Sequence, residues 1–161
     1  MSAKKPDWDE YFLIDIVPAI AKRASCDRGR SSAIIVRDNR IITTGYVGSP
    51  PGLPHCDDVG HLIHTVTDEE GKQSKHCVRT LHAEENAILQ AAKIGLSVDK
   101  ATLYCKLVPC FRCAMKIAAV GIVRVVAQKR YHADRRSIQI FKEAEVKLEI
   151  FEDSVELYAE Q

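Results

Sequence analysis

The chain has 161 residues, of which 46% are hydrophobic and 28% are charged, a composition typical of a folded globular protein and not of a disordered one. Lysine and arginine number 23, and aspartate and glutamate number 22, so the net charge is +1. This balance argues against a protein that mainly binds long nucleic acid, which usually has a basic excess. Small phosphorylated ligands are still possible, because they need only one or two cations.

Targeting signals and cysteine usage indicate the compartment. The longest apolar runs are short, such as Ile16–Ala21, and none approaches the length of a membrane span. Residues Met1–Trp8 lack the apolar segment of a secretory signal, so we expect a cytoplasmic protein. In that reducing compartment the six cysteines are more naturally thiolates or metal ligands than disulfides. With no internal repeat, we expect a single domain over residues 1–161.

The first third of the chain predicts a helix followed by a hairpin. Asp7–Ala24 has apolar residues at helical spacing, and Pro18 should kink or split that helix. Two short β-prone runs follow, Ala33–Val36 and Ile41–Tyr46. The Asp38-Asn39 pair between them is a turn signal and predicts a hairpin.

The segment at about 47–77 has no regular pattern, and its glycines and prolines break helices and strands. We expect a long loop there. So long a loop in a compact domain is often functional or held in place, and we expect a bound metal to hold this one.

Regular alternation of helix and strand resumes after residue 82. This order predicts an α/β protein with a partly parallel central sheet. The predicted elements are a helix over Ala83–Ile94, a strand over Ala101–Cys105, a helix over Cys110–Val120, a strand over Ile122–Ala127, a helix over Arg135–Ala144 and a strand over Val146–Phe151.

Two segments carry the residues of a zinc site. His82 and Glu84 lie at the start of one predicted helix, and Cys110 and Cys113 lie at the start of another. One imidazole and two thiolates leave the fourth position of a tetrahedral zinc open, which is the pattern of a catalytic site. Glu84 is close enough in sequence to handle the protons of a zinc-bound water. The alternative is a zinc-stabilised fold without catalysis, which would need a fourth protein ligand.

These segments resemble the zinc-dependent nucleoside deaminases, whose signature is H-x-E followed by P-C-x-x-C. His82–Ile88 (H-A-E-E-N-A-I) is similar to the form found in deoxycytidylate (dCMP) deaminases. The stretches Thr102–Cys110, Gly45–Gly52 and Trp8–Phe12 also resemble segments of that family. The resemblance covers most of the chain. It implies a three-layer α/β/α sandwich of the cytidine deaminase type, with a central mixed sheet of about five strands.

The resemblance also implies a reaction, the hydrolytic deamination of dCMP to dUMP and ammonia. Water activated by zinc would attack C4 of the cytosine ring, and Glu84 would transfer protons to N3 and to the departing amine. His82, Cys110 and Cys113 would hold the catalytic zinc. Such an enzyme supplies dUMP for dTMP synthesis.

Val47 departs from the family pattern, in which this position is usually Asn. In related deaminases that Asn contacts the nucleotide sugar, and nearby loop residues help to bind the allosteric nucleotide. Valine cannot make those hydrogen bonds. The resemblance therefore does not fix the exact nucleotide or the response to dCTP and dTTP.

Three further cysteines indicate a second metal site. Some family members hold a second zinc with a Cys after the first helix, a Cys in the Gly/Pro-rich loop and a ligand before the catalytic helix. Cys26, Cys56 and Cys77 are similar in position, and either His76 or His55 is the fourth candidate. A closed tetrahedral site would explain how the long loop stays ordered. The alternative is three free thiols. Cys105, within a strand, reads as a small buried hydrophobe.

A monophosphate substrate needs cationic or N–H donors. Arg28 resembles the Arg of the family's C-x-R stretch, and Arg79 is a second candidate. Tyr131 resembles a tyrosine that family members place near the pocket. The full set of predicted substrate-binding residues is Arg28, Tyr46, Val47, Arg79, Ala83 and Tyr131.

Partners and competing functions follow from the same resemblance. Family members are commonly hexamers, so a homo-oligomer is expected, and dCTP and dTTP are the possible effectors. The alternatives are a deaminase of dCTP or of modified dCMP, or a deaminase-like nucleic-acid-binding protein. The near-zero net charge and the absence of interleaved aromatic and basic residues argue against the last of these.

Overall fold

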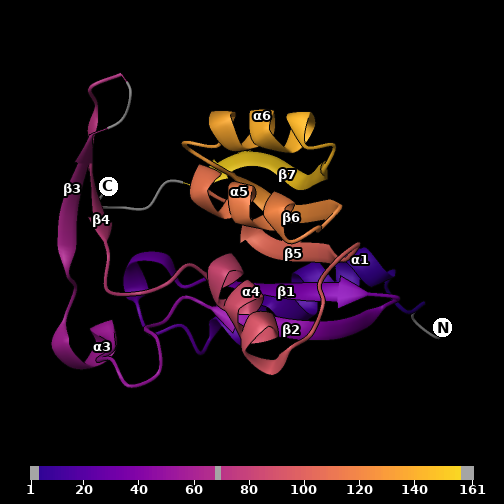
Figure 1. Ribbon diagram of the computed structural model, residues 1–161, viewed down its shortest axis with the longest axis horizontal. Helices are drawn as coiled ribbons and strands as arrows, with labels where there is room; N and C mark the ends of the chain where they lie inside the picture. Colours follow the sequence, from indigo (N-terminus) through magenta and orange to yellow (C-terminus); the bar gives the residue numbers. More distant parts are fainter. Residues whose placement is uncertain (1–3, 68–69, 157–161) are drawn as a thin grey trace.

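A five-stranded mixed sheet forms the centre of the computed structural model, which describes residues 4–67 and 70–156 (Figure 1). The strand order is β2-β1-β5-β6-β7. β1 is antiparallel to β2 and β5, whereas β5, β6 and β7 run parallel. This confirms the predicted mixed sheet. The strands are β1 (Ser32–Arg37), β2 (Arg40–Tyr46), β5 (Thr102–Leu107), β6 (Arg124–Tyr131) and β7 (Lys147–Glu156).

The predicted hairpin is β1 and β2, joined by a two-residue turn. Asp38 and Asn39 have φ angles of 52° and 58°. A left-handed conformation at both positions matches the twist of the two strands, and short Asx side chains tolerate it best after glycine.

Helices cover both faces of the sheet, because side chains of β1 alternate between two cores. Ala33 and Ile35 face a core shared with α4 (Ala83–Ile94), α5 (Phe111–Ala119) and α6 (Arg135–Glu143). Ile34 and Val36 face the opposite core, which holds the amino-terminal helix. Figure 1 shows α4, α5 and α6 in front of the sheet and α1 behind it. The predicted α/β/α layering is therefore confirmed.

The amino-terminal helix has three consecutive parts, α1 (Trp8–Glu10), the π-helical segment η1 (Tyr11–Ile16) and α2 (Val17–Ala21). Pro18 lies in the first turn of α2, where its missing N–H is tolerated. The wider π turn comes directly before it, so the expected irregularity takes the form of a local change of hydrogen-bond pattern. The helix ends at Ala21, earlier than the predicted Ala24.

The segment predicted as an irregular loop contains regular structure. A short helix, α3 (Cys56–Val59), is followed by a hairpin of β3 (Ile63–Thr67) and β4 (Gln73–Cys77). Figure 1 shows this hairpin standing to one side of the central sheet. All of β3 is exposed, so its β-branched residues form a strand without the usual buried face.

β2 and β7 are the outer strands of the sheet, and the outer side of β7 pairs with no strand among the described residues. Within those same residues, no helix is both long and apolar enough to span a membrane.

Candidate active site

The three predicted zinc donors meet where two helices begin. His82 is the N-cap residue of α4, and Cys110 is the N-cap residue of α5. Cys113 follows within the first turn of α5 and is buried. Gly95 ends α4 in a left-handed conformation, as its position after the helix predicted. The sequence thus brings one imidazole and two thiols together at the helix ends that favour negative charge.

The donor distances fit zinc. His82 Nδ1 lies 3.5 Å from Cys110 Sγ and 3.6 Å from Cys113 Sγ. Zinc bonds of about 2.0 Å to nitrogen and 2.3 Å to sulfur at a tetrahedral angle require a separation of about 3.6 Å. All three donor atoms also lie within 4.8 Å of one another. The residues present therefore suit a zinc ion with one coordination position left over.

Protons shared among these donors favour a thiolate. The Cys113 thiol donates to Cys110, and this hydrogen bond lowers the pKa of Cys110 to about 3 and raises that of Cys113. The Cys110 sulfur in turn raises the pKa of His82 to about 9. Zinc binds imidazole and thiolate in their deprotonated forms, so metal binding would displace these protons.

Glu84 lies beside the donors in the first turn of α4, with only 7% of its surface exposed. Burial raises the pKa of this carboxyl above its usual range, and the positive charge of His82 partly opposes that shift. A carboxyl whose pKa is raised holds a proton more readily than a solvated one, which suits a group that must both accept and return a proton.

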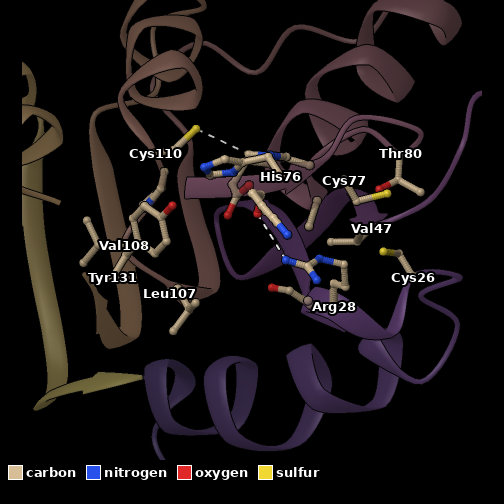
Figure 2. Close-up of a pocket in the computed structure, with 17 residues that line it drawn as sticks. Cys26, Arg28, Val47, His76, Cys77, Thr80, Leu107, Val108, Cys110 and Tyr131 are labelled. Carbon is tan, nitrogen blue, oxygen red and sulfur yellow. Dashed lines mark hydrogen bonds between the residues drawn. The ribbon is translucent and has the colours of Figure 1, made fainter. Parts of the chain in front are cut away.

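One pocket contains these groups, and Figure 2 shows its labelled lining residues. His82, Glu84 and Cys110 form one part of the lining. Arg28 and Lys75 supply positive charge to the lining, and the Arg28 guanidinium donates to the Lys75 carbonyl over 3.1 Å. Pockets that combine apolar walls with a few polar groups of this kind are typical ligand sites.

His76 lies between the two charged parts of the pocket. Burial lowers its pKa, and the nearby positive charges of His82 and Arg28 lower it further. His76, the metal donors His82 and Cys110, and Arg28 all line the same pocket.

The structure places four of the six predicted substrate-binding residues in this pocket. Those four are Arg28, Val47, Ala83 and Tyr131. The other two, Tyr46 and Arg79, are not part of the lining. The Tyr46 carbonyl accepts a hydrogen bond from the Asn86 side chain over 2.6 Å, which holds the adjoining Val47 at the pocket wall.

Arg79 Nε donates to the Gly60 carbonyl over 2.9 Å, so in this structure it supports the loop before β3. Sequence reasoning missed Lys75, which the hairpin carries to the pocket lining. The only signal for it was a cation near the cysteine that ends β4.

A second cluster of metal-type donors lies beside the pocket and contains Cys26, Cys56, His61 and Cys77, with all four donor atoms within 4.8 Å of one another. Cys26 Sγ is 3.6 Å from His61 Nδ1, and Cys56 Sγ is 3.5 Å from Cys77 Sγ. Its histidine differs from both predicted candidates.

Neither His76 nor His55 joins this cluster. His76 precedes Cys77 on a strand, and successive strand side chains point to opposite faces. It contacts Ser74 Oγ at 2.8 Å instead. His55 Nδ1 is 2.6 Å from Ser25 Oγ, so that nitrogen is already occupied.

Comparison with known proteins identifies the family. A family model described as "Cytidine and deoxycytidylate deaminase zinc-binding region" matches residues 6–129, which include every donor of both clusters. The chain belongs to this deaminase family. The fold and the His82, Cys110 and Cys113 constellation agree with that membership.

Named members of the deaminase family are similar over most of this chain. A deoxycytidylate deaminase of Schizosaccharomyces pombe is 37% identical over 89% of the chain, and that of Mycobacterium phage D29 is 39% identical over 78%. The match spans 97% of the phage protein but 44% of the yeast one. The chain thus covers less than half of that yeast relative.

A solved structure of the family gives the same fold. The dCMP deaminase of cyanophage S-TIM5, crystallised in complex with dCMP and dUMP, superposes with a TM-score of 0.71 at 26% identity. The match covers 92% of this chain and 99% of that one.

Proposed function

We propose that this chain is a zinc-dependent hydrolase that converts dCMP and water to dUMP and ammonia. The observation that carries the proposal is that one pocket is lined by Glu84 and the zinc donors His82 and Cys110 and also by Arg28 and Lys75. Cys113 completes the donor set. The relatives named deoxycytidylate deaminase and the S-TIM5 enzyme with dCMP and dUMP support the choice of nucleotide.

The chemistry follows from the residues at the metal end. His82, Cys110 and Cys113 would hold the zinc, which would supply a nucleophilic oxygen from water at neutral pH. Glu84 would carry one proton of the attacking water to N3 of the cytosine ring. It would then carry the other proton, from the new C4 hydroxyl, to the leaving amine, so that both protons of water are accounted for. Burial of its carboxyl excludes competing solvent from the proton transfers.

The rest of the pocket orients the nucleotide. Its base lies toward Glu84, and its 5′-phosphate lies toward Arg28 and Lys75, whose charges suit a phosphate. Val47 and Tyr131 form the walls between these ends. Because Val47 has no polar group, the sugar hydroxyl must be bound by another residue or by water.

We also propose that the second cluster holds a structural zinc, with Cys26, Cys56, His61 and Cys77 as its four ligands. The two donor separations of 3.6 Å and 3.5 Å support this, since tetrahedral zinc requires about 3.6 Å between nitrogen and sulfur and about 3.8 Å between two sulfurs. Total zinc near two per chain is expected, and a value near one would contradict the proposal.

Three further features belong to the same proposal. Both clusters need reduced sulfur, which the cytoplasm provides. Exposed apolar residues on α4 and α5, such as Leu89 and Met115, support assembly into a homo-oligomer, with a hexamer expected from the family. The nucleotides dCTP and dTTP are the proposed effectors of this assembly. Sedimentation analysis with and without each nucleotide tests both the oligomeric state and the response to the effector.

The decisive experiment is a deamination assay on the zinc-loaded protein with dCMP, CMP, dCTP, deoxycytidine and 5-methyl-dCMP. We expect preference for dCMP and a loss of about 100- to 10,000-fold in kcat for Glu84→Gln. Glu85→Gln is the matched control, because Glu85 pairs with Lys116 and does not line the pocket. A protein with full zinc that deaminates none of these compounds would refute the proposed function.

A further inference from the structure

The second cluster shares a wall with the pocket. Cys26 and Cys77 contribute sulfur atoms to the cluster, and both residues also line the pocket. Figure 2 shows these two residues and Arg28 along one side of the site, with Tyr131 and Val108 on the other. Gain or loss of a metal at the cluster would therefore alter the positions of residues in the pocket wall that contains Arg28.

A turn of three consecutive residues connects the cluster to the pocket cation. Cys26 is a cluster donor, with its Sγ 3.6 Å from His61 Nδ1. Asp27 follows, and its Oδ1 lies 3.0 Å from Nε2 of the same imidazole. Arg28 is next and lines the pocket. Asp27 and Arg28 belong to the single 3-10 turn η2 (Asp27–Gly29), so they cannot move independently.

The contact between Asp27 and His61 has the geometry of an outer-shell carboxylate. A histidine that binds metal through one nitrogen usually donates its other N–H to such a group, which fixes the ring and its tautomer. Removal of these partners typically lowers metal affinity by about 10- to 100-fold. Asp27 therefore orients a cluster ligand although it does not bind the metal.

A second cluster donor, Cys77, is also close in sequence to a pocket cation. Cys77 ends β4, and Lys75, two residues earlier on that strand, also lines the pocket. The Arg28 guanidinium donates to the Lys75 carbonyl over 3.1 Å. The cluster, through Cys26 and Cys77, and this hydrogen bond, between Arg28 and Lys75, thus join the same two segments of the chain.

We propose that Asp27 and His61 are positioning residues through which metal binding at the second cluster fixes Arg28 and Lys75 for the nucleotide phosphate. The cluster then determines the affinity for nucleotide and leaves the chemistry at Glu84 unchanged. This inference rests on the proposed function, because it takes the ligand to be a 5′-phosphorylated nucleoside.

The test compares ligands with and without the phosphate. Calorimetry on zinc-loaded protein carrying Glu84→Gln, which prevents turnover, gives dissociation constants for dCMP and for deoxycytidine. Asp27→Asn and His61→Ala should weaken dCMP binding about tenfold or more and change deoxycytidine binding less than twofold. Arg28→Ala removes the phosphate contact itself, so it should show the largest loss of dCMP affinity that this contact can account for. His61→Cys restores a metal donor but has no second N–H for Asp27, so it should recover zinc binding and leave dCMP binding as weak as in Asp27→Asn.

Two other readouts separate positioning from a general loss of structure. Zinc release to a chromogenic chelator should be faster in Asp27→Asn than in the matched surface variant Asp58→Asn. In the background that retains Glu84, Asp27→Asn should raise KM for dCMP with kcat within about twofold. Even if His61→Ala fails to fold, Asp27→Asn and His61→Cys still decide the question.

The outcomes distinguish this inference from the proposed function. Equal weakening of dCMP and deoxycytidine, or faster zinc release with unchanged dCMP affinity, would overturn the positioning role while dCMP deamination by the wild-type protein stood. A wild-type protein that neither binds nor deaminates dCMP would overturn both.

Discussion

Gly45 lies on β2 and packs against the helix α4, which begins at the zinc donor His82 and carries Glu84. Its replacement by alanine should displace these two residues and lower the catalytic rate. A Cβ atom there would lie 3.0 Å from the Cα of Ala87, and closer still to the amide nitrogen of Ala87 and the carbonyl oxygen of Ala83. Ordinary van der Waals contact begins at 3.4 Å, and the obstructing atoms are helix backbone that cannot rotate away. The start of α4 must therefore move outward.

The expected magnitude follows from that displacement. Overpacking of this kind costs about 1–3 kcal/mol of folding free energy, and each kcal/mol lowers Tm by about 2–4 °C in a chain of this size. A shift of about 1 Å at a catalytic group can reduce the rate by about 100-fold. We expect Gly45→Ala to fold with a lower Tm and to lose at least about tenfold in kcat for dCMP.

Thermal unfolding and steady-state kinetics on zinc-quantified samples test this prediction. Gly95→Ala is the comparison variant, because Gly95 is at the other end of α4, with φ of +71° and open space around it. Its cost of about 1–2 kcal/mol comes from backbone strain and should leave kcat unchanged. A Gly45→Ala protein with wild-type Tm and kcat would refute the packing argument.

Three other predictions concern separate parts of the molecule. Arg124→Met removes ion pairs to Asp9 and Glu149, whose carboxyl pKa values Arg124 holds below their usual range. Because these folded-state pKa values are lowered, the stabilisation is complete above about pH 5, where both carboxyls are ionised even in the unfolded chain, and disappears as pH falls through the folded-state values. Urea unfolding should show the variant about 1–2 kcal/mol less stable at neutral pH and nearly equal to wild type in acid, whereas a gap independent of pH would contradict the ion-pair argument. Asn39→Gly should raise stability by about 0.5 kcal/mol, since φ is 58° there, and a lower Tm would show that the asparagine side chain matters more than the backbone. Lys75→Ala should raise KM for dCMP about tenfold and leave deoxycytidine turnover unchanged, and equal effects on both would exclude a phosphate contact.

Features set by short stretches of sequence could be predicted. The helix α4 begins and ends as expected because His82 and Gly95 mark its ends and apolar residues repeat between them. Cys110 and Cys113 could be joined because two residues separate them on one helical turn. The central sheet followed from the alternation of strand and helix, and its parallel half from the crossovers through α5 and α6.

Features set by distant neighbours could not be predicted. The choice of His61 over His76 depends on which face of β4 carries Cys77 and on how α3 places the following loop. Lys75 reaches the pocket only because the β3–β4 hairpin forms, and β3 has no buried face to give the alternating pattern of a strand. Arg79 is near His82 in sequence, but its side chain donates to the Gly60 carbonyl, a partner distant in sequence that no local pattern indicates.

The outer edge of β7, which pairs with no strand in the described part of the chain, has a consequence for self-association. Unpaired N–H and C=O groups on such an edge are a template for a strand from another molecule, and Phe151 and Val155 on β7 are 45% and 49% exposed. Glu152 and Asp153 lie between them, so two β7 edges brought together at neutral pH would place like charges side by side. These two carboxylates therefore keep the edges of neighbouring molecules apart, and their replacement by neutral residues should promote aggregation by edge pairing.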